Sequence, residues 1–326
     1  ARNIWVPNLL QKTYRGTQPR ITFFCGPSLE DWYADTPKTT GIGGSETAVT
    51  EVARLLATRG WQPIVFNSTG AHEGSHDGVV YASWERFRSE RSSDIFVSWR
   101  QPEVIGEEPN APQRWLWCHD LHYGDRLTPE RAEGFTKILG VSPWHADYLR
   151  AIYPFLTETD FVENGVDLGR FDQQVKRNRF RFVYSSSPDR GLATLLKFWP
   201  YLKQMEPAAE LHIFYGWESF LKTAELRMPD LYRAHAMIME LGNQPGVVWR
   251  GRVGQQELAK EMLAADIWAY PTSFLETFGL TAVEALAANL KIVTSRAGNL
   301  PYIVGDCGVC IPGYAGSIAY GRTFLE

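Results

Sequence analysis

Two glutamates eight residues apart, Glu276 and Glu284, lie in the part of this sequence whose residue types could do the most chemistry. A short apolar segment, a loop of small and polar residues and an alanine-rich segment follow one another here, which predicts a strand, a loop and a helix. Ligands of open α/β sheets bind at such carboxyl ends of strands. The amides of Phe278, Gly279 and Leu280 would open the helix, and unpaired amides at a helix start bind phosphate groups. We therefore expect a diphosphate at this point, with the two carboxylates about 12 Å apart if the chain between them is helical.

A basic residue, Arg190, precedes Gly191 at a second predicted helix start. A guanidinium can hold two phosphate oxygens at once and keeps its charge at any physiological pH. In the N-terminal half, Gly41-Ile-Gly43-Gly44 also precedes a helical pattern. A dinucleotide-binding fingerprint needs its glycines directly after the first strand, whereas about fifteen residues separate Cys25 from Gly41, which disfavours an oxidoreductase.

Short apolar segments alternate with helical patterns along the chain, which is typical of parallel sheets covered on both faces. The expected strands are 21–25, 64–67, 79–82, 94–98, 114–118 and 138–142, then 180–185, 211–215, 247–249, 267–270 and 291–294. The expected helices are 47–59, 143–152, 192–203, one long helix within 217–241, 255–264 and 279–288. Turn residues and charges interrupt this alternation near Asp167, so we predict two α/β domains, 1–166 and 167–326.

Taken together, these motifs resemble glycosyl transferases group 1, a family of retaining GT-B glycosyltransferases with two Rossmann-like domains facing across a cleft. In that family the first glutamate of the pair contacts the donor sugar and the second binds the ribose hydroxyls. The resemblance gives these roles to Glu276 and Glu284, and gives Arg190 a place on the diphosphate. The family usually has a second basic residue about five positions earlier, where this chain has Ser185.

The resemblance also assigns residues outside the Glu276 segment. Gly43 and Gly44 match the glycine loop that faces the phosphates, and Arg252 and Val253 match the segment whose backbone receives the base. Similar glycosyltransferases carry a histidine after the strand predicted at 114–118, which here is His119. The resemblance implies that His119 hydrogen-bonds the sugar or the acceptor, so the expected catalytic residues are Glu276, His119 and Arg190.

Neither a metal nor a further cofactor is expected beyond a nucleotide-sugar donor of the UDP or GDP type. The sequence contains no Asp-x-Asp pair that would hold a divalent ion on a diphosphate. His119 and His122 are spaced i, i+3 without a third ligand, and Cys307-Gly-Val-Cys310 has no second half-site, so we expect the cysteines to serve packing.

Composition sets the remaining expectations. The net charge of -4 gives nucleic acid no long-range attraction, and no apolar run approaches the roughly 20 residues of a membrane-spanning helix. We expect a cytoplasmic protein, and we expect both ends, Ala1 and Glu326, to belong to a longer polypeptide. We expect a metal-independent hexosyltransferase with an unknown glycan, lipid-linked or protein acceptor, and the resemblance implies that it retains the anomeric configuration. A sugar-nucleotide epimerase and a catalytically inactive nucleotide-sugar-binding module remain alternatives.

Overall fold

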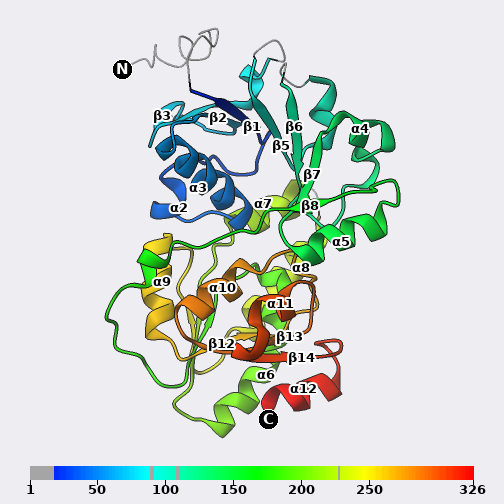
Figure 1. Ribbon diagram of the computed structural model, residues 1–326. Helices are drawn as coiled ribbons and strands as arrows, with labels where there is room; N and C mark the ends of the chain where they lie inside the picture. Colours follow the sequence, from blue (N-terminus) through cyan, green and yellow to red (C-terminus); the bar gives the residue numbers. More distant parts are fainter. Residues whose placement is uncertain (1–17, 89–91, 108–110, 227) are drawn as a thin grey trace. The chain divides into compact units, whose positions relative to one another are not determined.

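The computed structural model describes residues 18–326, except 89–91, 108–110 and 227 (Figure 1). The contacts divide the chain into two compact units: the N-terminal unit extends to Pro37 and continues over Ile42–Asn164, and the C-terminal unit comprises Lys38–Gly41 and Gly165–Glu326. The second unit thus begins two residues before the domain boundary predicted between 166 and 167. It also takes in Lys38–Gly41, which the prediction assigned to the first domain.

The N-terminal unit is built on an eight-stranded sheet with the order β3-β4-β2-β1-β5-β6-β7-β8. Every neighbouring pair is parallel except β3 and β4. The strands are β1 (Arg20–Phe24), β2 (Gln62–Asn67), β3 (Gly74–His76), β4 (Val79–Ser83), β5 (Ile95–Trp99), β6 (Gln113–Trp117), β7 (Lys137–Gly140) and β8 (Asp160–Phe161). The α-helices are α2 (Thr36–Thr39), α3 (Gly44–Thr58), α4 (Pro129–Gly134) and α5 (Pro143–Ile152).

The C-terminal unit has a six-stranded, fully parallel sheet with the order β11-β10-β9-β12-β13-β14. Its strands are β9 (Arg181–Tyr184), β10 (Glu210–Ile213), β11 (Val247–Trp249), β12 (Ile267–Tyr270), β13 (Lys291–Ser295) and β14 (Gly308–Ile311). Its helices are α6 (Leu192–Met205), α7 (Glu218–Leu226), α8 (Asp230–Leu241), α9 (Gln255–Ala264), α10 (Leu280–Ala287), α11 (Leu300–Val304) and α12 (Ile318–Leu325). Two short 3₁₀ turns, η4 (Leu168–Phe171) and η5 (Pro188–Arg190), matter for the site below.

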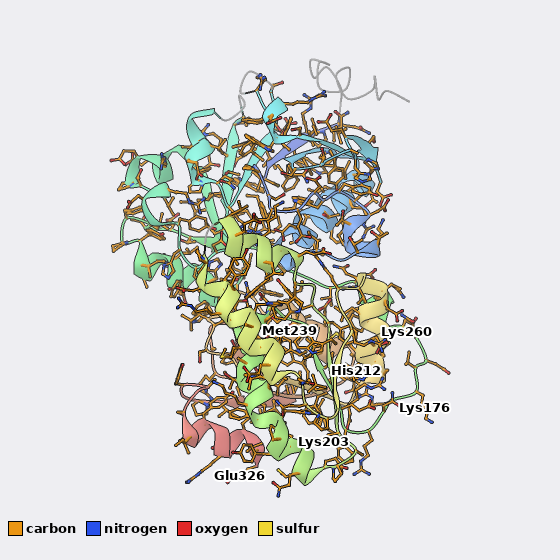
Figure 2. The ribbon with its side chains drawn as sticks, turned by 180° about the vertical axis from the view of Figure 1, so that it is seen from behind. Lys176, Lys203, His212, Met239, Lys260 and Glu326 are labelled. Carbon is orange, nitrogen blue, oxygen red and sulfur yellow. The ribbon has the colours of Figure 1, made fainter. Side chains whose placement is uncertain are left out.

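Helices cover both faces of the second sheet. Helices α10 and α11 lie over one face (Figure 1), and α8 with its labelled Met239 lies over the other (Figure 2). Helix α6 buries Leu192, Leu195, Leu196 and Trp199 in the core of this unit, the i, i+3, i+4, i+7 stripe of a helix packed on a sheet. Because β10 and β11 extend the sheet from β9 in one direction and β13 and β14 extend it from β12 in the other, the strand order reverses between β9 and β12.

Most predicted elements are confirmed, and the bounds of α5, α9, β11 and β12 agree with the prediction residue for residue. The single long helix within 217–241 is wrong, since the chain forms α7 and α8 as separate helices. Pro229 stands directly before α8. Proline has no amide hydrogen and clashes with the preceding turn, so a helix cannot run through it without a kink or break. No helix in the described part of the chain combines the length and the apolar character needed to cross a bilayer.

Candidate active site at the carboxyl ends of β9 and β12

Arg190 and Glu276 lie in the loops that follow β9 and β12, the two strands between which the order of the second sheet reverses. The two loops touch: a Cβ placed on Gly191, whose φ is +124°, would lie 2.5 Å from the carbonyl oxygen of Pro271. Only a residue without a side chain fits there, so glycine lets the Arg190 loop lie directly against the Glu276 loop. The crevice at such a reversal is where open α/β sheets bind their ligands.

The carboxylate of Glu276 is buried and bound by two side chains. The Tyr270 hydroxyl donates to Oε1 over 2.6 Å, and Nη1 of Arg190 lies 3.6 Å from the same oxygen. The Arg190 guanidinium also stacks over Phe274, 4.1 Å from the ring centroid. Although burial opposes it, the Glu276 carboxylate raises the pKa of Arg190, which therefore stays charged. The predicted pair of Arg190 and Glu276 is brought together, and more than a third of the Arg190 side chain (37%) remains exposed.

The backbone of Glu276 is held by a segment after β13 that the sequence did not indicate. The backbone amide of Asn299 donates to the backbone carbonyl of Glu276 over 2.8 Å, and the side-chain amide of Asn299 donates to the carbonyl of Phe278 over 2.9 Å. A Cβ on Gly298, whose φ is +59°, would lie 2.3 Å from the Glu276 oxygen and 2.6 Å from its nitrogen. The 298–299 segment thus holds the backbone of the Glu276 loop in place.

Helix α10 begins at Leu280, one residue later than predicted. Gly279 is its N-cap and has left-handed backbone angles (φ 98°, ψ 51°), so Gly279 and Phe278 belong to the loop. The first bonded amides of the helix are those of Ala282 and Val283, which both donate to the Gly279 carbonyl. Among the described residues, none accepts a hydrogen bond from the amide of Leu280. An unpaired amide at a helix start is suited to a phosphate oxygen.

Glu284 lies in the second turn of α10 and is paired with a residue from the start of the unit. It is 5% exposed, and its Oε1 is 3.4 Å from Nη2 of Arg170, itself 9% exposed. Burial raises the pKa of Glu284, and the charge of Arg170 counteracts that rise. Asp167 caps the η4 turn that carries Arg170, because its carboxylate accepts from the Gly169 amide. Sequence reasoning missed Arg170, since nothing in the local pattern shows a contact across 114 positions.

Two further residues of the C-terminal unit were singled out from the sequence. Arg252 and Val253 follow β11 and are half-buried, and the Arg252 guanidinium donates to the Ser219 hydroxyl in α7 over 3.4 Å. Ser185 directly follows β9, and its hydroxyl has no hydrogen-bond partner among the residues that the structure describes.

Gly43, Gly44 and His119 belong to the N-terminal unit. Helix α3 begins at Gly44, and a Cβ on Gly43 would lie 2.4 Å from Oε2 of Glu46. His119 follows β6 and packs against Trp117, with the two ring centroids 4.7 Å apart. Burial, helped by the charge of Arg100, lowers the pKa of His119 well below its usual range. Its imidazole is therefore neutral at pH 7 and could accept or donate one hydrogen bond.

A charged group beside His119 was not predicted. Arg100, which follows β5, forms a bidentate ion pair with Asp120, which follows β6, with N–O distances of 2.7 and 2.6 Å. Its third guanidinium nitrogen is 3.7 Å from Glu46 in the first turn of α3. Burial raises the pKa of Glu46, and Arg100 counteracts this shift. The group gathers at the carboxyl end of the first sheet, which a search for local motifs could not show.

The cysteine pair departs from the expectation of packing. Cys310 is half-buried on β14, but Cys307 is exposed. The described ranges hold no group of three or more His, Cys, Asp and Glu side chains placed to bind a metal ion. His122 instead lies 3.1 Å from the Tyr148 hydroxyl through its Nε2.

Comparison with known proteins agrees with this geometry. Residues 169–319, which contain Arg190, Glu276 and Glu284, match the family model described as Glycosyl transferases group 1. This part of the chain belongs to that family. Among curated proteins, an MMP alpha-(1->4)-mannosyltransferase of Mycolicibacterium hassiacum is 34% identical over 152 residues, which are 46% of this chain and 34% of that protein. A D-inositol 3-phosphate glycosyltransferase of Corynebacterium glutamicum is 38% identical over 89 residues, 27% of this chain and 21% of that protein. This chain thus aligns with about a third or less of the length of these relatives.

Solved structures show that the fold is GT-B. A sucrose-phosphate synthase from Thermosynechococcus elongatus superposes with a TM-score of 0.67 at 16% identity, covering 95% of this chain and 92% of that chain. Anabaena HepE in complex with UDP-glucose gives a TM-score of 0.63 at 15% identity, covering 94% and 90%. Both units, outside as well as inside the glycosyl transferases group 1 region, therefore take the predicted fold.

Proposed function

We propose that this protein is a glycosyltransferase that moves a sugar from a nucleoside-diphosphate sugar to an acceptor hydroxyl. The observation that carries the proposal is the meeting of Arg190 and Glu276 beside the start of α10, at the strand reversal of the family-matched unit. The two curated relatives above are named as a mannosyltransferase and a glycosyltransferase, and HepE was solved with UDP-glucose. We infer a UDP-linked or GDP-linked donor, and the UDP-glucose bound to HepE supports the first of these.

Cleavage of the glycosyl–phosphate bond builds negative charge on the departing nucleoside diphosphate and positive charge on the sugar. The Arg190 guanidinium and the Leu280 amide would bind the diphosphate, and preorganised donors of this kind contribute about 3–4 kcal/mol each to transition-state stabilisation. Glu276 would orient the sugar through the carboxylate oxygen that Tyr270 leaves unbound. Glu284 would accept from the ribose hydroxyls, and the charge of Arg170 opposes the rise in the pKa of Glu284 that burial causes.

The proposal includes two finer features of the reaction. Transfer proceeds without a divalent ion, because Arg190 and the helix start supply the positive charge. It proceeds with retention, which the group 1 resemblance implies, and we assign no protein nucleophile. His119, neutral and beside the Arg100–Asp120 pair, would hydrogen-bond the sugar or the acceptor.

The test is a panel of UDP-sugars and GDP-sugars incubated with the purified chain and followed by proton NMR. A transferase should release free sugar and nucleoside diphosphate slowly from one of them in the absence of acceptor. The matched control is Glu276→Gln, which keeps shape but removes charge and should abolish the release. A new nucleotide-sugar would indicate an epimerase instead, and saturable binding without turnover would indicate a binding module; either result would refute the proposed transfer.

A further inference from the structure

Tyr270 is the last residue of β12, and its side chain points from the sheet toward the Glu276 loop. It is 1% exposed, and its hydroxyl lies 2.6 Å from Oε1 of Glu276. A carboxylate can only accept, so the phenol must donate. Burial, reinforced by the Glu276 charge, raises the pKa of Tyr270 well above its usual range, and the proton therefore stays on the phenol.

A second hydroxyl stands behind the first. Oγ of Ser186, in the loop after β9, lies 3.2 Å from the Tyr270 oxygen, and geometry alone lets either atom donate. Because the phenol proton is committed to Glu276, Ser186 must be the donor of this bond. The result is a chain of hydrogen bonds in one direction, from Ser186 to Tyr270 to Glu276. Hydrogen bonds arranged in series polarise and strengthen one another in a buried setting.

This series of hydrogen bonds ends on one oxygen of the Glu276 carboxylate. Both Tyr270 and Arg190 contact Oε1, and no described residue hydrogen-bonds Oε2. Two fixed partners on one oxygen determine the plane of the carboxylate. They therefore set the direction in which Oε2 can accept a hydrogen bond from a sugar hydroxyl.

We propose that Tyr270, supported by Ser186, is a positioning residue that orients Glu276 toward the donor sugar. The inference rests on the proposed transfer and assigns to this reaction a residue that does not itself touch the substrate. Its chemical consequence is specific: Tyr270 should affect the use of the sugar, not the binding of the nucleotide, because the charged group to which it donates a hydrogen bond is the sugar-side carboxylate.

The test compares Tyr270→Phe with Tyr320→Phe. Tyr320 is an equally buried tyrosine of the same unit (2% exposed), and its hydroxyl also meets a serine, Ser295, at 2.7 Å. Hydrogen bonds to charged groups are worth enough that Tyr270→Phe should lower kcat roughly tenfold to hundredfold. KM for the donor and the affinity for the free nucleoside diphosphate should stay within about twofold. Tyr320→Phe should leave both kcat and KM near wild type.

Ser186→Ala removes the outer hydroxyl alone and keeps the proposal testable if Tyr270→Phe does not fold. It should lower kcat severalfold in the wild-type background and add nothing in the Tyr270→Phe background, because the chain is already broken there. Equal kcat values for Tyr270→Phe and Tyr320→Phe, or additive effects of Ser186→Ala and Tyr270→Phe, would overturn the positioning role while leaving the transferase proposal intact. A wild-type chain that turns over no donor in the panel would overturn the transferase proposal, and the positioning role with it.

Discussion

Replacing Arg170 by methionine should destabilise the protein through Glu284, a residue 114 positions away in the sequence. The side chains of Arg170 and Glu284 are 10% and 6% exposed, and their nearest charged atoms are 3.4 Å apart. At an effective dielectric constant of about 20, two unit charges at that distance attract by about 5 kcal/mol. Part of this attraction offsets the cost of removing both charged groups from water. Breaking a buried ion pair by removing one partner typically costs about 3–5 kcal/mol. We therefore expect Arg170→Met to lower the free energy of unfolding by about 3 kcal/mol.

The assay is urea unfolding of the full chain, followed by far-UV circular dichroism and by tryptophan fluorescence. With a denaturant slope of about 1–3 kcal/mol per molar urea, the midpoint for the C-terminal unit should fall by about 1 M or more. The control is the double variant Arg170→Met/Glu284→Gln, in which no charge is left unpaired. It should recover most of the loss.

The pH dependence gives an independent check. Burial raises the pKa of Glu284 in the folded state, and removing Arg170 should raise it further. An acid with a raised folded pKa binds more protons when folded, so stability falls as pH rises from the unfolded pKa, about 4.3, through the folded one. The deficit of Arg170→Met should therefore be full at pH 8 and shrink as pH falls toward 4. A midpoint shift below about 0.3 M, or a deficit that Glu284→Gln leaves unchanged, would refute the reasoning.

Four further predictions concern donor binding and catalysis. Arg190→Ala should lower turnover by roughly 10²–10³, the effect of losing one preorganised donor, and steady-state rates within about threefold of wild type would contradict its role on the diphosphate. In calorimetry, Glu284→Ala should weaken binding of free nucleoside diphosphate whereas Glu276→Ala should spare it, so equal losses would be evidence against the division into ribose and sugar ends. A chelator should leave transfer unchanged, and the NMR spectrum of the product from an α-linked donor should show an α-linkage. Loss of activity with chelator would mean that a metal neutralises the diphosphate, and a β-linked product would exclude retention.

The sequence predicted the repeating elements of both units because these depend on local patterns. Strand β12 is short and apolar, and α9 has apolar residues at helical spacing, so both were found with their observed bounds. Strands β3, β8 and β14 were missed, and all three lie at sheet edges. An edge strand has one neighbour to pair with, and its apolar pattern is correspondingly weaker. Val309 on β14, for example, is 55% exposed.

The candidate site was predicted only in part. Arg190, Glu276 and Glu284 could be found from motif and spacing, since each lies near a glycine that marks a helix start. Their partners could not. The sequence pattern around Tyr270 is that of an ordinary apolar strand. The pattern around Arg170 indicates an exposed charged residue in the segment that connects the two domains. Only the folded chain shows that one donates to Glu276 and the other pairs with Glu284.

The close fit of Gly298 against the Glu276 backbone has a consequence for redesigning this protein. Any side chain at position 298 would have to displace the loop at Glu276, because a Cβ there would overlap its oxygen and nitrogen. The loop after β12 and the turn after β13 therefore pack as one rigid unit, although they are separate in the sequence. An exchange of donor specificity that grafts the first loop from a relative should carry residues 298–299 with it, and a mutagenesis library that varies position 298 should yield few active clones.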